Sequence, residues 1–363
     1  MKSSSLSIGP IARLLIIVSL LGAFTVPGTL GQVTFKGLPM VPLPGNFSYA
    51  TVAGDFGRNG ARDVAVLSTN AVNSLYILTN DGTGTLTLAH TYPTQQSGQG
   101  IATADLNGDG SLDLVVASVD PISQLWGYSV LLGNGDGSFQ SPVFYPQNVF
   151  ALLNPAIAIA DFNHDGKPDL AITTGSGVAV LLGNGDGTFG SPAYFSPGVG
   201  PSIVSADFSG DGKLDIATGG SFGSGGLAIL LGNGDGTFQP AVYSSTALFN
   251  GLLAADLNRD GKADLVTGTP AAQVYLGNGD GTFKAPSPIG QPLEGPFVTV
   301  LADINGDGKP DAIGGRQMSS QACDGGLFLG NGDGTFGSYI LVLEQVFSSV
   351  FAHPRWKLSR PQT

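Results

Sequence analysis

The nine residues Asp161-Phe-Asn-His-Asp-Gly-Lys-Pro-Asp169 decide the fold of this chain, because the pattern Asp-x-Asn-x-Asp-Gly-x-x-Asp recurs along it. Successive copies start 46 to 56 residues apart, at Asp55, Asp105, Asp161, Asp207, Asp256 and Asp303. Six units of this kind tile residues 50–340. Internal repeats of this length are typical of propellers and solenoids, so we expect a chain of similar supersecondary units rather than one unique globular core.

Each unit contains four short runs with the pattern of β-strands. In the third unit, residues 157–160 lead into the acidic loop and residues 170–173 leave it. A third run at 178–182 reaches a glycine-rich turn, after which the chain returns toward Tyr194 and Phe195. Apolar, β-branched runs separated by glycine turns predict antiparallel hairpins. Four such strands per unit predict an all-β fold of propeller blades, whereas a linear solenoid usually has shorter units and capped ends.

A second motif follows the third run of each unit. It reads Leu-Gly-Asn-Gly-Asp-Gly-Thr-Phe at residues 182–189, 231–238, 276–283 and 329–336, with serine replacing threonine at 132–139. Asn-Gly and Asp-Gly pairs favour tight turns because these residues tolerate positive φ. Calcium-binding glycine-rich rolls use similar residues, but they need a copy about every nine residues. One copy per unit favours a structural turn over a further calcium site.

Composition and charge restrict the function. The chain has 56 Gly and 23 Pro among 363 residues, and 42% of its residues are hydrophobic, which is enough for a core between many turns. Its net charge is −12, and 17 of the 27 acidic residues stand at positions 1, 5 or 9 of the six loops. Acidity concentrated in this way argues against binding of nucleic acid through its phosphates.

The first 31 residues have the pattern of a secretory signal peptide. Lys2 and Arg13 precede an eleven-residue apolar run at 14–24, and small residues precede Gln32. An apolar helix of this length is too short to cross about 30 Å of hydrocarbon, so no membrane span is expected once the signal is removed. We therefore predict a secreted or cell-surface protein. Cys323 is the only cysteine, so rigidity cannot come from an internal disulfide.

The acidic loop has the chemistry of a site for a hard divalent cation. Positions 1, 3, 5 and 9 offer side-chain oxygens, position 7 offers a carbonyl, and Gly at position 6 permits the sharp bend. Such a set suits Ca²⁺ better than Mg²⁺. An EF-hand is excluded, because position 12 is Val116 or Ile172 instead of Glu and the flanks are strands. The remaining alternative is a set of Asx turns that need no metal.

The two motifs in fixed order resemble the FG-GAP and VCBS-type repeats of integrin α-subunit propellers and secreted bacterial proteins. The resemblance implies calcium-binding β-propeller blades in which the acidic loop joins the first two strands. It implies about five structural Ca²⁺ sites, with the ligands Asp105, Asn107, Asp109 and Asp113; Asp161, Asn163, Asp165 and Asp169; Asp207, Ser209, Asp211 and Asp215; Asp256, Asn258, Asp260 and Asp264; Asp303, Asn305, Asp307 and Asp311. The first copy, with Asp55, Gly57, Asn59 and Asp63, lacks an oxygen at position 3 and a carboxylate at position 5, so it is expected to be weak.

The number of blades stays open. Six units are recognisable, whereas propellers of the resembled kind commonly have seven blades. Residues 33–39 resemble an outer strand without a blade, and residues 346–351 resemble the inner strand of an incomplete seventh blade. We expect a signal peptide at 1–31, a propeller at 32–345 and an atypical tail or incomplete blade at 346–363.

Two classes of function remain. Loops opposite the calcium loops vary, and they carry Trp126, Tyr128 and Phe249, which could stack on sugar rings or simply pack between blades. This favours a binding or adhesion module for a glycan or a cell-surface or matrix protein. The alternative is a lyase-like carbohydrate-active enzyme, with Arg316 or Tyr128 supporting a bound Ca²⁺. Neither His90 nor Cys323 has an evident catalytic partner, which disfavours the enzyme.

Overall fold

The computed structural model describes residues 48–68, 74–94, 100–119, 125–150, 155–175, 177–197, 200–220, 226–245, 249–269, 272–290, 296–319 and 322–346. Within these ranges every regular element is a β-strand, and none is a helix. The predicted signal peptide at 1–31 and most of the tail at 346–363 lie outside the described residues, as does the proposed outer strand at 33–39.

The strands form six antiparallel sheets of four strands each, and each sheet corresponds to one sequence unit. The first three blades are β1 (Ser48–Gly54), β2 (Asp63–Ser68), β3 (Ser74–Asn80) and β4 (Leu86–Pro93); β5 (Gly100–Ala104), β6 (Asp113–Val119), β7 (Leu125–Leu131) and β8 (Val143–Phe150); β9 (Ile157–Ala160), β10 (Asp169–Thr174), β11 (Gly177–Leu181) and β12 (Ala193–Phe195). The other three are β13 (Ser202–Ala206), β14 (Asp215–Gly220), β15 (Gly226–Leu230) and β16 (Val242–Ser245); β17 (Asn250–Ala255), β18 (Asp264–Thr269), β19 (Gln273–Tyr275) and β20 (Ser287–Pro288); β21 (Pro296–Ala302), β22 (Asp311–Ser319), β23 (Ala322–Gly330) and β24 (Phe336–Val346).

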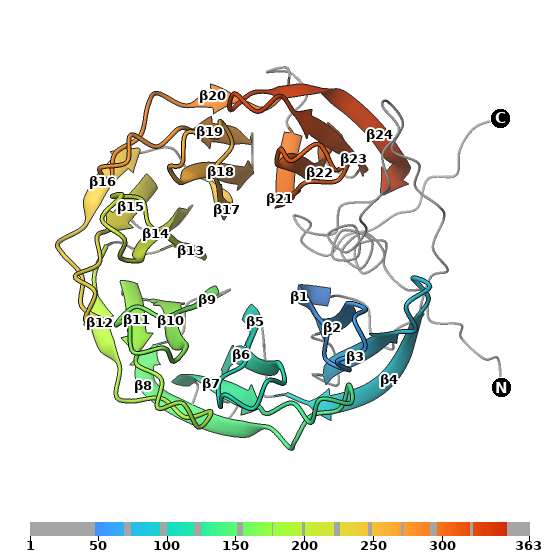
Figure 1. The fold of residues 1–363 in the computed structure, drawn as a ribbon, viewed down its shortest axis with the longest axis vertical. Helices are drawn as coiled ribbons and strands as arrows, with labels where there is room; N and C mark the ends of the chain where they lie inside the picture. The colour runs from blue at the N-terminus through green and yellow to red at the C-terminus, as the bar shows by residue number, and fades with distance from the viewer. Residues whose placement is uncertain are drawn as a thin grey trace.

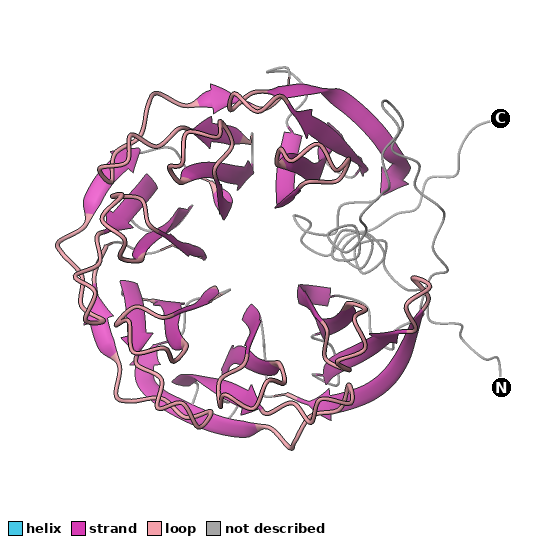
Figure 2. Ribbon diagram, viewed as in Figure 1, coloured by secondary structure: helices cyan, strands magenta, loops and turns pink. Residues whose placement is uncertain are grey.

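The six sheets are arranged around a common centre as the blades of a six-bladed β-propeller (Figure 1). Each blade is a simple meander, with its first strand nearest the centre and its fourth strand at the rim. Figure 2 shows that the described residues of the ring form only strands and connecting loops. This confirms the predicted all-β propeller with six four-stranded units. The seventh blade predicted at 346–351 falls outside the described residues, except that Val346 ends β24.

The hydrophobic core lies between neighbouring blades. Five buried clusters each combine residues of two consecutive blades; in one, Val115 and Val130 of the second blade pack with Ile172 and Leu181 of the third. The apolar side chain at position 2 of each acidic loop is also buried: Phe56, Leu106, Phe162, Phe208, Leu257 and Ile304. A blade cannot bury both of its faces alone, so stability depends on neighbours around the ring.

The second turns of the second to sixth blades fasten each of these blades to the one before it. Their last glycine N–H donates to the carbonyl at position 2 of the preceding acidic loop, as Gly187 does to Leu106 at 3.3 Å and Gly281 does to Phe208 at 2.9 Å. The following aromatic ring often meets a ring of the preceding blade edge-on, as Phe139 meets Phe56 with centroids 5.3 Å apart. The structure thus gives the second motif a structural role.

Three aromatic residues that could have served recognition belong to the core instead. Trp126 and Tyr128 lie within β7 and are 1% and 2% exposed, and Phe249 is 2% exposed in the cluster between the fourth and fifth blades. Tyr128 also stacks on Tyr145 with ring centroids 5.2 Å apart. The idea that these rings stand on an open loop was wrong. Strand β7 extends further than the glycine pattern suggested and buries Trp126 and Tyr128, whereas Phe249 is buried immediately before β17.

Candidate metal centre

Every acidic loop joins the first and second strands of its blade. The residue before each loop pairs across the sheet with position 9, as Ala160 pairs with Asp169 and Ala302 pairs with Asp311. Position 9 is therefore the first residue of the second strand, and positions 1 to 8 form the loop itself. Because this register is the same in all six blades, the loops project from one side of the propeller.

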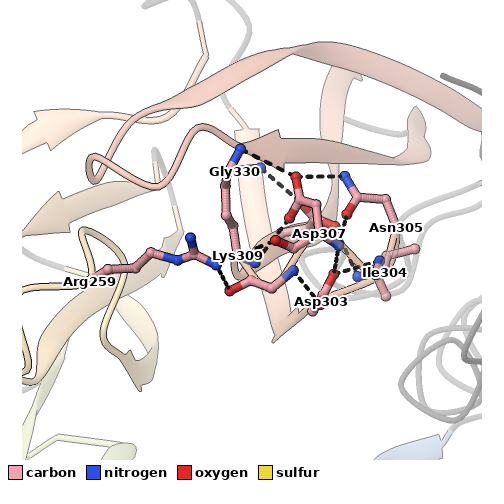
Figure 3. A network of polar contacts seen from close by, with 10 residues as sticks. Arg259, Asp303, Ile304, Asn305, Asp307, Lys309 and Gly330 are labelled. Carbon is pink, nitrogen blue, oxygen red and sulfur yellow. Dashed lines mark hydrogen bonds and ion pairs between the residues drawn. The ribbon is translucent and has the colours of Figure 1, made fainter. Parts of the chain in front are cut away.

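The sixth loop shows the local geometry (Figure 3). Asp303 Oδ1 accepts the N–H of Gly306 at 2.7 Å and of Asp307 at 3.1 Å, and its Oδ2 accepts the N–H of Gly308 at 2.8 Å. Asn305 Oδ1 accepts the same Asp307 N–H at 2.9 Å. Asp307 Oδ1 accepts the N–H of Lys309 at 2.9 Å. Side-chain oxygens from positions 1 and 3 therefore converge on one backbone donor.

The same convergence recurs in the other well-formed loops. The N–H at position 5 lies between oxygens of positions 1 and 3 at 3.0 to 3.1 Å in three further loops, through Asp105 and Asn107, Asp161 and Asn163, and Asp256 and Asn258. In the fourth loop, the hydroxyl of Ser209 instead donates to Asp207 at 3.3 Å. The chain thus brings positions 1, 3 and 5 together in five loops.

The carboxylate at position 9 is placed differently from the rest of the loop. Asp311 is fully buried; its Oδ2 accepts the N–H of Ile304 at 2.9 Å and its Oδ1 accepts the N–H of Gly330 at 2.8 Å. Asp113, Asp169, Asp215 and Asp264 are equally buried and form the equivalent contacts. Asp63 is also buried, and it accepts from Asn80 of the second turn and from Gly57 at position 3 of the loop. Burial raises the pKa of these carboxyls, although the backbone N–H groups oppose the rise. Position 9 therefore ties the acidic loop to the second turn of the same blade.

The first loop departs from the others, as its sequence suggests. Asp55 accepts backbone N–H groups from Asn59 at 2.9 Å and Gly60 at 2.9 Å, but Gly57 supplies no side chain at position 3. The amide of Asn59 donates to Asn80 O at 3.2 Å, which ties it to the second turn. Asp55 is thus the one carboxylate among positions 1, 3 and 5 of this loop.

Positions 1, 3 and 5 fit a hard cation by their chemistry, since they offer only oxygen donors from adjacent side chains. Among the described residues, however, no group of three or more Asp, Glu, His or Cys side chains is arranged to hold a metal. Positions 1 and 5 contribute two carboxylates per loop, and the third carboxylate, at position 9, is engaged by two N–H groups. Each of its oxygens keeps a second lone pair, so a contribution to a metal is compatible with these bonds.

Lysine at position 7 places a positive charge beside the loop. Lys213 Nζ lies 3.1 Å from Asp211 Oδ2, and Lys309 Nζ lies 3.3 Å from Asp307 Oδ2, whereas Lys167 reaches Asp165 only at 3.9 Å. The backbone N–H of Lys213, followed by its ammonium hydrogen bond, lowers the pKa of Asp211. These side chains are solvent-accessible, so each pair contributes little stability. A bound cation would compete with the ammonium for the position-5 carboxylate.

Sequence reasoning missed the residue at position 4. This position adopts positive φ, which is expected for Gly108, Gly210 and Gly306, but Arg58, His164 and Arg259 adopt it at 50°, 59° and 61°. A non-glycine residue with such a φ is uncommon and costs energy. The signal was present in the sequence, because three loops replace the glycine of the others with a long or basic side chain.

Residues considered for catalysis are not brought together by the described structure. His90 lies in β4 and its nearest ring neighbour is Tyr92, with centroids 6.3 Å apart. His164 belongs to the third acidic loop. Cys323 and Arg316 occupy paired strands β23 and β22, but their side chains are outside the described part. A cavity of about 350 Å³ lies between the fourth and fifth blades, with Asp207, Asp256 and Lys262 in its lining.

A family model for the FG-GAP-like repeat matches residues 55–116, 161–218, 207–267 and 256–314, which together make up more than half of the chain. No curated protein matches the chain. A lectin from Agrocybe aegerita, described for recognition of non-reducing terminal N-acetylglucosamine, is similar in structure, with a TM-score of 0.56 and 21% identity over 82% of this chain and 80% of that one. BBS1N, solved in complex with ARL6DN, has a TM-score of 0.51 and 13% identity over 82% and 81% of the two chains.

Identities this low show a shared fold and nothing more. Within the described strands and loops, no helix is present that is long and apolar enough to cross a membrane.

Proposed function

Because the chain belongs to the FG-GAP-like repeat family, we propose that it is an exported, calcium-stabilised propeller that binds a glycan or a cell-surface or matrix protein. The observation that carries this proposal is the difference between the two sides of the ring. The acidic loops and second turns are short, repetitive and tied to each other by hydrogen bonds. Connections on the opposite side differ in sequence and length from blade to blade. Variable loops on a rigid scaffold are where recognition usually resides.

Calcium is proposed for the five loops that bring three oxygen-bearing side chains together. Position 1 would bind through its carboxylate, positions 3 and 5 through their side-chain oxygens, and position 7 through its carbonyl. The cation would relieve repulsion between the carboxylates at positions 1 and 5. The first loop is proposed to bind weakly or not at all, since Gly57 and Asn59 replace an oxygen donor and a carboxylate.

The metal proposal is tested by titrating Ca²⁺ into the signal-free protein after treatment with chelator. The heat of binding gives the number of bound ions, and the midpoint of thermal unfolding is measured at each calcium concentration. We expect about five bound ions and a midpoint that rises with calcium, because an ion that binds only the folded state stabilises it by mass action. A midpoint that stays constant in calcium and in chelator would show that the loops are hydrogen-bonded turns only.

A glycan partner is the first candidate for the opposite side, since the similar lectin binds a terminal sugar. The test screens the mature chain against polysaccharides and glycans, in calcium and in chelator, and follows both retention and release of cleavage products. Retention without products supports the binding module. Release of cleavage products would instead establish the carbohydrate-active enzyme. If the screen gives neither retention nor products, a protein partner is the remaining form of the proposal, and binding to cell surfaces tests it.

A further inference from the structure

Position 4 of the acidic loops alternates around the ring. The first, third and fifth loops carry Arg58, His164 and Arg259, whereas the second, fourth and sixth carry Gly108, Gly210 and Gly306. Each of the three long side chains extends toward the next blade. A methyl group added at Gly110 would meet the Arg58 guanidinium at 2.7 Å, one at Gly234 would meet the His164 ring at 3.4 Å, and one at Gly308 would meet Arg259 at 2.6 Å.

Arg259 shows which chemical group the junction between the fifth and sixth blades accepts. Figure 3 shows Arg259 extending from the fifth blade to the sixth loop. Its Nη2 donates to Gly308 O at 2.5 Å and to Asp307 O at 3.4 Å. Arg58 lies against Gly110 at the same place in the second loop. Carbonyl oxygens of the sixth loop therefore bind the Arg259 guanidinium, whose planar set of N–H donors suits several acceptors at once.

The junction between the fourth and fifth blades has the same receiving loop without an arginine. Gly210 stands at position 4 of the fourth loop, and a methyl group added at Gly261, the counterpart of Gly308 and Gly110, would meet no atom within 4 Å. The cavity of about 350 Å³ lies at this place, and Gly210 and Gly261 both line it. Its volume is in the range of small-ligand pockets.

When no calcium is bound to the fourth and fifth loops, charge in the cavity favours a cation. Asp207 and Asp256 contribute two carboxylates, and Lys262 is the one basic residue of the lining. The stem of Lys262 lies along Gly279, where an added methyl would meet its Cδ at 3.1 Å. Its charge acts on Asp280 of the second turn, whose pKa is lowered first by Thr282 and then, to a smaller extent, by Lys262. Lys262 therefore leans toward the second turn.

We propose that the junction between the fourth and fifth acidic loops is a socket for an arginine side chain of a protein partner. The guanidinium would enter beside Gly261, as Arg259 of the chain itself enters beside Gly308, and would be held by the fifth loop's carbonyls with Asp256 nearby. In the calcium-free protein, the net charge, which is −12 for the full chain, adds long-range attraction for a basic partner. This site lies on the side of the acidic loops, so it is separate from the recognition surface proposed above.

The test uses N-acetyl-L-arginine amide as the probe, with the matching citrulline and lysine amides as controls, on the full signal-free protein in calcium and in chelator. Backbone amide shifts of Gly210 and Gly261 report binding at the site. We expect the arginine probe to bind with a dissociation constant on the order of 1 mM, as suits so small a ligand, and citrulline to bind at least about tenfold more weakly.

The number of arginine probes that each variant binds then tests which junctions between blades are open. Arg259→Gly should open the next junction and add one bound arginine, with new shifts at Gly308, whereas Arg62→Ala removes an exposed arginine without opening a junction and should add none. Gly210→Arg should fill the socket from within and abolish binding. Because its Cβ would meet Gly279 O at 3.1 Å, that chain could fail to fold, and Ser205→Leu narrows the same cavity as a second variant. No shift at Gly261, equal binding of citrulline, or unchanged binding after either filling variant would overturn the proposal.

Discussion

The acidic loops and the second turns contain the same residue types, yet the structure uses them in different ways. In the third blade, Asp161 and Asp165 of the loop face solvent and converge with Asn163, whereas Asp186 of the turn closes its own hairpin. Thr188 donates to Asp186 Oδ1 through its N–H at 2.9 Å and through its hydroxyl at 2.6 Å. The loop is open toward a ligand, and the turn is complete without one.

The glycines of the acidic loops and of the second turns also differ in what surrounds them. Gly166 in the loop and Gly187 in the turn have nearly equal φ values, 81° and 84°. An added methyl would meet nothing within 4 Å at Gly166, but at Gly187 it would meet Leu132 Cδ2 of the preceding blade at 2.7 Å. A conformational requirement alone explains the first glycine, whereas the second is also needed for close contact between blades. Similar sequence therefore does not imply a similar role.

The largest expected effect comes from the residue that joins the two regions. Asp169→Ala would leave the N–H groups of Phe162 and Gly183 buried without an acceptor. At about 1–3 kcal/mol for each unsatisfied group, the free energy of unfolding should fall by about 2–6 kcal/mol. Asp186→Ala, the matched change in the exposed turn, should cost less. Urea unfolding of both proteins measures the difference, and equal losses would show that position 9 does not join loop and turn.

The two glycines provide the next comparison. Gly166→Ala should cost about 1–2 kcal/mol, because an L-residue must adopt a left-handed backbone. Gly187→Ala should cost about 1–3 kcal/mol more, since its methyl also collides with Leu132. Gly166 and Gly187 have nearly the same φ, so the difference in thermal stability between the two variants isolates the cost of the contact with Leu132 of the preceding blade. If both variants lost the same stability, Leu132 would have to move away at no cost.

Calcium should distinguish the two regions as well. Asp165→Asn keeps an oxygen for the Lys167 N–H but removes a carboxylate from the proposed site. The number of bound ions should fall by one, and with calcium at a hundredfold excess over its dissociation constant the protein should lose about 2.7 kcal/mol of calcium-dependent stability. Asp186→Asn should change neither quantity. Calorimetric titration of both variants checks this, and a loss of ions in Asp186→Asn would make the turn a metal site.

The smallest expected effect is on the way the stability of the fold changes with pH. Hydrogen bonds from the Thr188 side chain and N–H lower the pKa of Asp186, so its folded pKa lies below its unfolded value. Its stabilising contribution is present above the unfolded pKa and is lost as pH falls through the folded pKa. Burial shifts the pKa of Asp169 in the opposite direction, so its contribution is lost as pH rises through the folded pKa.

Asp186→Asn should therefore lose less stability than the unmodified chain when the pH falls from about 6 to about 3. Thermal midpoints at several pH values in a calcium-free buffer measure this difference. An identical acid dependence of the two proteins would show that the turn hydrogen bonds do not favour the ionised carboxyl.

Much of the fold was predictable because it repeats. A run such as 178–182 followed by Gly183-Asn-Gly-Asp-Gly187 specifies a strand and a turn by local preferences alone, and six copies make the pattern hard to mistake. Prediction was poorer where strands continued past the pattern. The glycine pattern predicts a loop at Trp126 and Tyr128, but both lie in β7 and are buried in the core between the second and third blades. Aromatic residues beside glycines carry no local signal that separates a core from an open surface.

The strand order within each blade, the positions of the acidic loops and the oxygen donors that they offer can all be read from the amino-acid sequence, because they depend on residues close together in the chain. Which of those oxygen donors stay exposed depends on how the strands and blades pack together. Asp169 and Asp165 are four residues apart, but the start of a strand buries one beneath the second turn and leaves the other in solvent. Likewise, the contact of Arg259 with Gly308 joins residues of two blades that lie 49 positions apart and that no local pattern relates.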